Sequence, residues 1–190
     1  MLRIIIFASG SGTNAENIIE YFKNSTLAEV SFVVSNNTNA GVLERAKRLN
    51  IPYRVVSKKE MATDTFSNFL AEQADFIVLA GFLLKIPDGM ISLFPNTIVN
   101  IHPALLPKYG GKGMYGMHVH RAVVANKESE TGITIHYVNE QYDEGTIIFQ
   151  KAVALDHSDT PEDVAAKIHV LEQENFPKVI EELLKAIDEG

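Results

Sequence analysis

The chain has 190 residues, 46% of them hydrophobic and 22% charged, as in a soluble globular protein, and we expect one domain over residues 1–190. It has no cysteine, which excludes disulfides and thiolate metal sites and agrees with a cytoplasmic location. The net charge is −7 without a Lys/Arg cluster, and the first apolar run is too short to span a membrane, so we expect neither nucleic acid nor a membrane as partner.

Apolar runs and helical periodicities alternate along the chain. The apolar runs predict strands at residues 2–8, 30–34, 53–56, 76–80, 97–101, 131–138 and 147–155. Helical spacing predicts helices at residues 13–23, 42–49, 57–73 and 160–188, the last of them bent near Pro177. This order predicts an α/β fold with an open, mostly parallel twisted sheet and helices on both faces, which is a Rossmann-like arrangement.

A glycine-rich segment follows the first strand and leads into the first helix. It consists of Gly10, Ser11, Gly12, Thr13 and Asn14. Backbone N–H groups at a helix N-terminus favour a phosphate, and glycines let a ligand come close to the backbone. A dinucleotide site would need an acidic residue near the end of the second strand, where the chain instead has Ser35-Asn36-Asn37. We therefore favour a monophosphate site over a dinucleotide site; a tight turn without a ligand is the alternative.

Three polar residues have the chemistry of an acyl-transfer site. Asn100 and His102 share one side of the fifth strand if it stays extended, and Asp143 lies in a loop between two later strands. An amide donor and an imidazole suit a developing oxyanion and a proton transfer, and a nearby carboxylate would raise the pKa of the imidazole and favour its charged form. Taken alone, an Asn or His at a strand end is more often structural and an Asp in a polar loop more often solvated, and spacing does not show that Asp143 reaches His102.

The string Asn100-Ile101-His102-Pro103-Ala104-Leu105-Leu106-Pro107-Lys108-Tyr109 resembles the signature of the folate-dependent formyltransferase family. Similar strings occur at residues 10–14, 79–82 and 143–145, so the resemblance covers nearly the whole chain. It implies that a formyl group passes directly from 10-formyltetrahydrofolate, as co-substrate and without a metal, to the amine of a phosphorylated acceptor. The glycine loop and the length most resemble members whose acceptor is glycinamide ribonucleotide, which implies a place in purine synthesis.

The resemblance also implies roles for individual residues. Asn100, His102 and Asp143 match the catalytic trio, and residues 10–14 match the loop that binds the substrate phosphate. Glu172 matches the acid on the amine side of the acceptor. The folate pocket would be formed by Leu83, Leu84, Ile86, Ile91, Val138, Asn139, Glu140, Gln141 and Tyr142.

The sequence departs from the family pattern at two places. Leu84 stands where the family has an arginine, which affects contacts along the folate. Residues 110–117 form a longer, glycine-rich segment that is either a lid over the folate side or a mobile surface loop.

The remaining histidines give no sign of a metal site. His118 and His120 form a His-x-His pair without a third ligand at metal spacing, and we expect no metal there. We expect His136 to pack or to form a site wall, and His157 and His169 to be structural or exposed.

Two other interpretations of the sequence compete with a formyltransferase that acts on a small phosphorylated amine. Family members that formylate methionyl-tRNA carry a basic C-terminal domain, whereas this sequence ends in an acidic segment. A nucleotide-binding module without chemistry would keep the glycine loop but has no use for Asn100, His102 and Asp143 together. We expect a monomer or a homodimer that acts on small molecules.

Overall fold

A seven-stranded sheet forms the centre of the molecule in the computed structural model, which describes residues 1–189. Its strand order is β3-β2-β1-β4-β5-β6-β7. The first five strands in this order run parallel to one another. The sixth, β6, is antiparallel to both of its neighbours, β5 and β7. The predicted open, mostly parallel sheet is confirmed.

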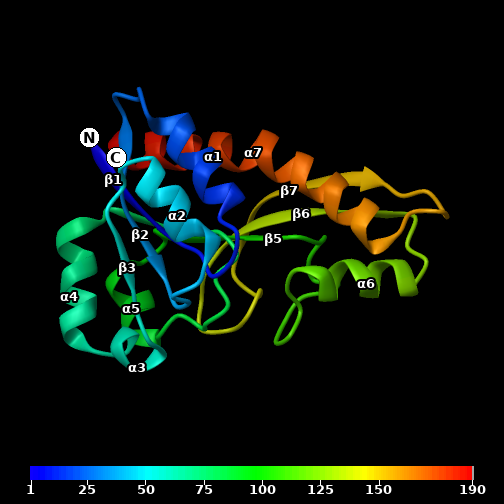
Figure 1. Ribbon diagram of the computed structural model, residues 1–190, viewed down its shortest axis with the longest axis horizontal. Helices are drawn as coiled ribbons and strands as arrows, with labels where there is room; N and C mark the ends of the chain where they lie inside the picture. Colours follow the sequence, from blue (N-terminus) through cyan, green and yellow to red (C-terminus); the bar gives the residue numbers. More distant parts are fainter. Residues whose placement is uncertain (190) are drawn as a thin grey trace.

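The strands and helices alternate along the first half of the chain (Figure 1). The strands are β1 Leu2–Phe7, β2 Ala28–Ser35, β3 Tyr53–Val55, β4 Phe76–Leu79, β5 Ile98–His102, β6 Glu130–Tyr137 and β7 Ile147–Ala154. The helices are α1 Thr13–Phe22, α2 Gly41–Arg48, α3 Lys58–Met61, α4 Asp64–Gln73, α5 Asp88–Leu93, α6 Met117–Ala125 and α7 Pro161–Glu189.

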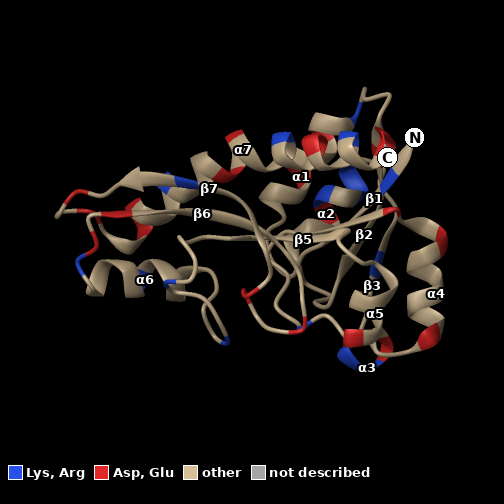
Figure 2. Ribbon diagram, turned by 180° about the vertical axis from the view of Figure 1, so that it is seen from behind, with Lys and Arg blue, Asp and Glu red and all other residues tan. Residues whose placement is uncertain are grey.

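The core has two halves, one on each face of the sheet, because successive residues of a buried strand point to opposite sides. Ile4 and Ile6 of β1 pack with residues of α1, α2 and α7, while Ile5 and Phe7 pack with residues of α4 and α5. Helices thus cover both faces, as Figure 1 shows. Lys and Arg are dispersed among Asp and Glu along the ribbon and form no single basic face (Figure 2).

Two details of the helices differ from the sequence prediction. The helix predicted at residues 57–73 is two helices, because Thr63 accepts a hydrogen bond from the Phe66 amide and caps a new start. The helices α5 and α6 were not predicted. The final helix extends through Pro177 as one element, as predicted. No helix within residues 1–189 combines the length and the apolar character needed to cross a bilayer.

The parallel strands β1, β4 and β5 are neighbours in the sheet, so their carboxyl ends meet at one edge. The glycine loop follows β1, the segment from Gly81 follows β4, and the proline-rich string follows β5. Ligands of open α/β sheets bind at this edge. The three motifs therefore meet at the edge of the sheet where a ligand is expected.

Candidate active site

A cavity of about 690 Å³ lies at the carboxyl ends of β1, β4 and β5. Its wall includes all five residues of the glycine loop, together with Asn100, His102, Asp143 and Glu172. Residues that are far apart in the sequence thus share one cavity, whose size lies within the range of small-molecule sites.

The glycine loop is shaped by Gly12 at the start of α1. Gly12 has a φ of 78°, and a Cβ atom there would lie 2.5 Å from the Cβ of Val42, so both the backbone angle and the packing require glycine. The N–H groups of the first turn of α1 have no partner within the helix, and the positive end of its dipole lies here. This end of the cavity suits an anion.

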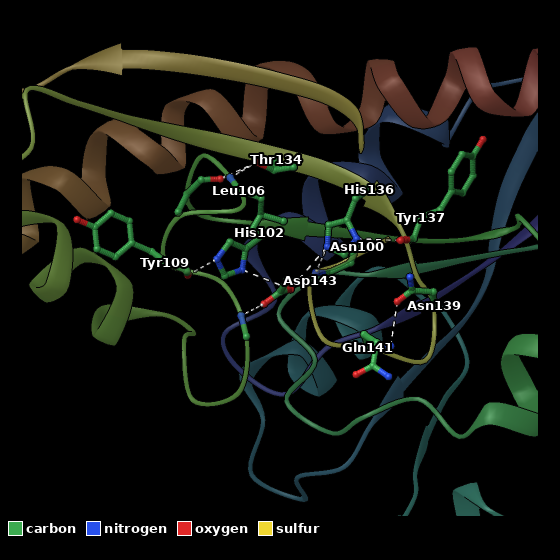
Figure 3. Close-up of polar contacts among 12 residues, drawn as sticks. Asn100, His102, Leu106, Tyr109, Thr134, His136, Tyr137, Asn139, Gln141 and Asp143 are labelled. Atoms are coloured by element: carbon green, nitrogen blue, oxygen red, sulfur yellow. Dashed lines mark hydrogen bonds and ion pairs between the residues drawn. The ribbon is translucent and has the colours of Figure 1, made fainter. Parts of the chain in front are cut away.

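His102 is 3% exposed, and each of its two ring nitrogens lies near a polar partner (Figure 3). Its Nε2 lies 2.7 Å from the carbonyl oxygen of Tyr109, which can only accept, so Nε2 carries a proton. Its Nδ1 lies 3.6 Å from Oδ1 of Asp143. Burial lowers the pKa of His102 below its usual value, even though Asp143 and the Tyr109 carbonyl act to raise it. Asp143 thus acts on the pKa of the imidazole in the expected direction, but the effect of burial is larger and opposite.

Asn100 is bonded to His136 of the neighbouring antiparallel strand, where the two residues are directly paired. The Asn100 Nδ2 lies 3.1 Å from Nε2 of His136, and Nδ1 of His136 lies 2.9 Å from the Tyr137 carbonyl oxygen. Because that carbonyl fixes the ring proton on Nδ1, the Nε2 accepts from the Asn100 amide. The second N–H of this amide remains available for a ligand.

Asp143 has a φ of 57°, which is unusual for a residue other than glycine, and such strain concentrates at functional sites. Its Oδ2 accepts a hydrogen bond of 2.9 Å from the Gly111 amide, and its Oδ1 lies 3.6 Å from both Nδ1 of His102 and Nε2 of His136. Burial would raise the pKa of Asp143, but the contact with His136, the charge of His102 and the Gly111 amide together lower it. The carboxylate is therefore ionised.

Glu172 of α7 also lines the cavity. The Asn14 side chain donates a hydrogen bond of 3.1 Å to Oε2 of Glu172 and accepts one of 3.1 Å from Gln173. Burial raises the pKa of Glu172, and the bond from Asn14 opposes this only in part. A carboxyl group with a raised pKa in a cavity is a candidate for function. The side chain of Asn14 faces α7, so only its backbone N–H is left for the anion site.

Most of the residues predicted for the folate line the same cavity, namely Leu83, Leu84, Ile86, Val138, Asn139, Gln141 and Tyr142. Ile91 and Glu140 are the two predicted folate residues that do not line this cavity. Ile91 lies on α5 and packs against the second half of the core, and the Glu140 side chain is exposed and lies outside the cavity wall.

Several cavity residues were missed by the sequence prediction. Lys112, Met114 and Tyr115 come from the loop of residues 110–116, and His120 and His169 from α6 and α7. The expected role of His136 as a site wall is confirmed, whereas His169, although exposed, also lines the cavity. The spacing of the sequence motifs did not indicate that Lys112 lines the cavity, because the position of this residue depends on the path of the loop. Within residues 1–189, no group of three or more His, Cys, Asp or Glu side chains is arranged to hold a metal ion.

Comparison with known proteins gives a consistent result along the chain. The family model described as formyl transferase matches residues 2–180. The chain is 34% identical to the phosphoribosylglycinamide formyltransferase of Bacillus subtilis (strain 168), over 100% of this chain and 98% of that protein. It is 37% identical to the chloroplastic phosphoribosylglycinamide formyltransferase of Arabidopsis thaliana, over 99% of this chain and 68% of the plant protein.

Solved structures agree with the sequence comparison. The crystal structure of phosphoribosylglycinamide formyltransferase from Bacillus halodurans superimposes with a TM-score of 0.85 at 37% identity, covering 96% of this chain and 95% of that one. The glycinamide ribonucleotide transformylase 1 of Geobacillus kaustophilus gives a TM-score of 0.85 at 38% identity, covering 97% of this chain and 99% of that one.

Proposed function

This chain belongs to the formyl transferase family, and from that premise we propose that it transfers the formyl group of 10-formyltetrahydrofolate to the amino group of glycinamide ribonucleotide in purine synthesis. The observation that carries the proposal is the single cavity that joins an anion-binding helix terminus, a polar trio and an apolar wall. Such a cavity can hold a phosphorylated amine beside a formyl donor.

The phosphate of the acceptor binds at residues 10–14, where backbone N–H groups point into the cavity end. Glu172 contacts the glycinamide part. The folate binds along Leu83, Leu84, Ile86 and the loop that contains Val138 and Tyr142. This arrangement directs the amine toward the formyl carbon near Asn100, and positioning two bound reactants supplies much of the acceleration.

The reaction proceeds by direct attack of the neutral amine on the formyl carbon. The free N–H of the Asn100 amide stabilises the oxygen of the tetrahedral intermediate, and loss of one such donor typically lowers the rate by roughly 10²–10³-fold. As the amine nitrogen becomes positive, His102 takes its proton on Nδ1, and the adjacent Asp143 carboxylate stabilises the imidazolium. The C–N bond to the folate then breaks, and the proton passes to the folate nitrogen.

The fixed position of the His102 ring determines which of its nitrogens can accept a proton. Nε2 is bonded to the Tyr109 carbonyl, so Nδ1 is the ring atom that can accept a proton. The 3.6 Å separation from Oδ1 of Asp143 leaves the lone pair of Nδ1 unused until a proton arrives. A proton at Nδ1 would lie between the ring and a carboxylate that is already ionised.

The direct test is an absorbance assay for folate deformylation with three acceptors: glycinamide ribonucleotide, methionyl-tRNA and water. We expect turnover with glycinamide ribonucleotide only. Equal rates with methionyl-tRNA, or rapid hydrolysis without an acceptor, would contradict the proposed acceptor.

We further propose that residues 1–190 act as one domain in the cytoplasm, as a monomer or a homodimer, on small molecules and without nucleic acid. The absence of cysteine and the lack of a basic face support this. Light scattering after gel filtration will give the oligomeric state.

A further inference from the structure

The helix α7 contains a break in its hydrogen-bond ladder next to Glu172. Pro177 lies inside the helix and has no N–H, so the carbonyl of Gln173, four residues earlier, loses its helical partner. Pro177 is buried, and an unpaired carbonyl in such a place is costly. Gln173 is the residue that follows Glu172, so the defect lies directly at the cavity wall.

The side chain of Asn17 on α1 fills this gap. Its Nδ2 donates a hydrogen bond of 2.9 Å to the Gln173 carbonyl oxygen. One turn earlier, Asn14 bonds to the side chains of both Glu172 and Gln173, at 3.1 Å each. Asn14 and Asn17 are three residues apart and therefore lie on one face of α1, and their hydrogen bonds show that this face meets α7.

These bonds connect the two ends of the acceptor site. Asn14 and Asn17 belong to the first turns of α1, whose N-terminus carries the anion site, and their partners belong to the turn of α7 that carries Glu172. A carbonyl left without a partner would allow this turn of α7 to shift or to bind water. The distance between the phosphate site and the Glu172 carboxyl group would then be poorly fixed.

We propose that Asn17 is a positioning residue for the acceptor: it compensates for Pro177 and thereby holds Glu172 at the correct distance from the glycine loop. This inference rests on the proposed function, in which Glu172 contacts the glycinamide part of the acceptor. Asn17 itself does not line the cavity, so its effect on the acceptor is indirect.

The experiment is a double-mutant cycle on Asn17 and Pro177. Asn17→Ala removes the donor, and we expect the KM for glycinamide ribonucleotide to rise roughly 3- to 10-fold, as for one lost buried hydrogen bond, with kcat and the folate KM within twofold. Pro177→Ala restores a backbone N–H for the Gln173 carbonyl. In the double variant the acceptor KM should therefore return to within about twofold of the wild-type value.

Tyr21→Phe is the matched control. Tyr21 lies on the same face of α1 and donates a hydrogen bond of 2.9 Å to Glu181 of α7, away from the cavity. This variant loses a contact between the same two helices and should leave the acceptor KM unchanged. Thermal unfolding of each variant separates a loss of stability from a change in KM.

The outcomes distinguish the inference from the proposed function. An unchanged KM in Asn17→Ala, a rise that Pro177→Ala does not reverse, or an equal rise in Tyr21→Phe would each overturn the role of Asn17. Glu172→Gln tests the premise, because it keeps the shape and removes the charge. If Glu172→Gln leaves the acceptor KM unchanged, the assignment of Glu172 fails; if it raises that KM while Asn17→Ala does not, only the inference fails.

Discussion

At the scale of single residues, the two histidines beside Asp143 have different tasks although both face the same carboxylate. Each ring has one nitrogen bonded to a backbone carbonyl, that of Tyr109 for His102 and that of Tyr137 for His136. The second nitrogen of His136 accepts from Asn100, so its task is to orient that amide. Within residues 1–189 no amide donates to the second nitrogen of His102, which supports its proposed role as the proton acceptor.

We expect Asp143→Asn to lower kcat by roughly 10²-fold or more, because the amide can no longer stabilise the imidazolium that forms on His102. The KM values for both substrates should change little, since the carboxylate acts on the intermediate. Steady-state kinetics with each substrate varied in turn will measure this. Near-normal turnover would contradict the role of Asp143 in proton transfer.

The protonation state of His102 can be measured without substrate. Burial lowers the pKa of this ring, so its titration midpoint should lie below the ordinary value of about 6.5, with the ring neutral above the midpoint and charged below it. Because Asp143 acts to raise the pKa of His102, Asp143→Asn should move the midpoint to a still lower pH. Nuclear magnetic resonance titration of the imidazole C–H signals will measure both midpoints.

The His102 signal can be assigned from its loss in His102→Gln. A midpoint above 6.5 in the wild-type protein would show that the ring starts charged, and the proposed direction of proton transfer would then be reversed.

At the scale of elements, most strands and helices were predictable because their periodicity follows from burial. Residues 4–7 of β1 are apolar and fully buried, and Ser57 caps α3 by accepting a hydrogen bond from the Glu60 amide. The helices α5 and α6 were not predicted; α5 has only six residues, and α6 begins directly after a glycine-rich segment. Local sequence carries little signal for such helices.

The contacts of the site were predictable only in part, because they depend on register and loop path. Asn100 and His102 follow from the alternation of one strand. The bond from Asn100 to His136 depends on the pairing of β5 with β6, and the bond from His102 to Tyr109 depends on a turn in which Tyr109 has a φ of 57°. Neither arrangement has a local signature in the sequence, and for the same reason the sequence could not show that Asp143 reaches His102.

Gly12 gives a test of how the glycine loop is built. We expect Gly12→Ala to lower the free energy of unfolding by about 2–4 kcal/mol, because a Cβ atom adds left-handed backbone strain and overlaps Val42. Urea unfolding will measure this. Gly10→Ala is the matched control, since a Cβ at Gly10 meets nothing within 4 Å, and its stability should stay within about 0.5 kcal/mol of the wild type. Equal effects at the two positions would refute the steric account.

At the scale of the whole molecule, the loop of residues 110–116 connects the cavity to the acid–base pair. The carbonyl just before the loop accepts from His102, and the Gly111 amide donates to Asp143. Gly111 and Gly113 have φ values of 94° and 85°, which L side chains rarely adopt. The N-terminal end of the loop is thus attached to His102 and Asp143, and we expect bound substrates to restrict the motion of the loop.

This coupling predicts that both substrates together protect the loop from proteolysis. Lys112 is exposed and lines the cavity, so trypsin should cleave after it in the free protein, and cleavage should slow several-fold when glycinamide ribonucleotide and an inert folate analogue fill the cavity. Lys127 is the internal control: it is exposed, has a φ of 53° in the connection between α6 and β6, and lies outside the cavity wall, so its cleavage should not change. Mass spectrometry of timed digests will follow both sites. If the ratio of the two cleavage rates is the same with and without ligands, residues 110–116 form a surface loop that does not close over the reaction.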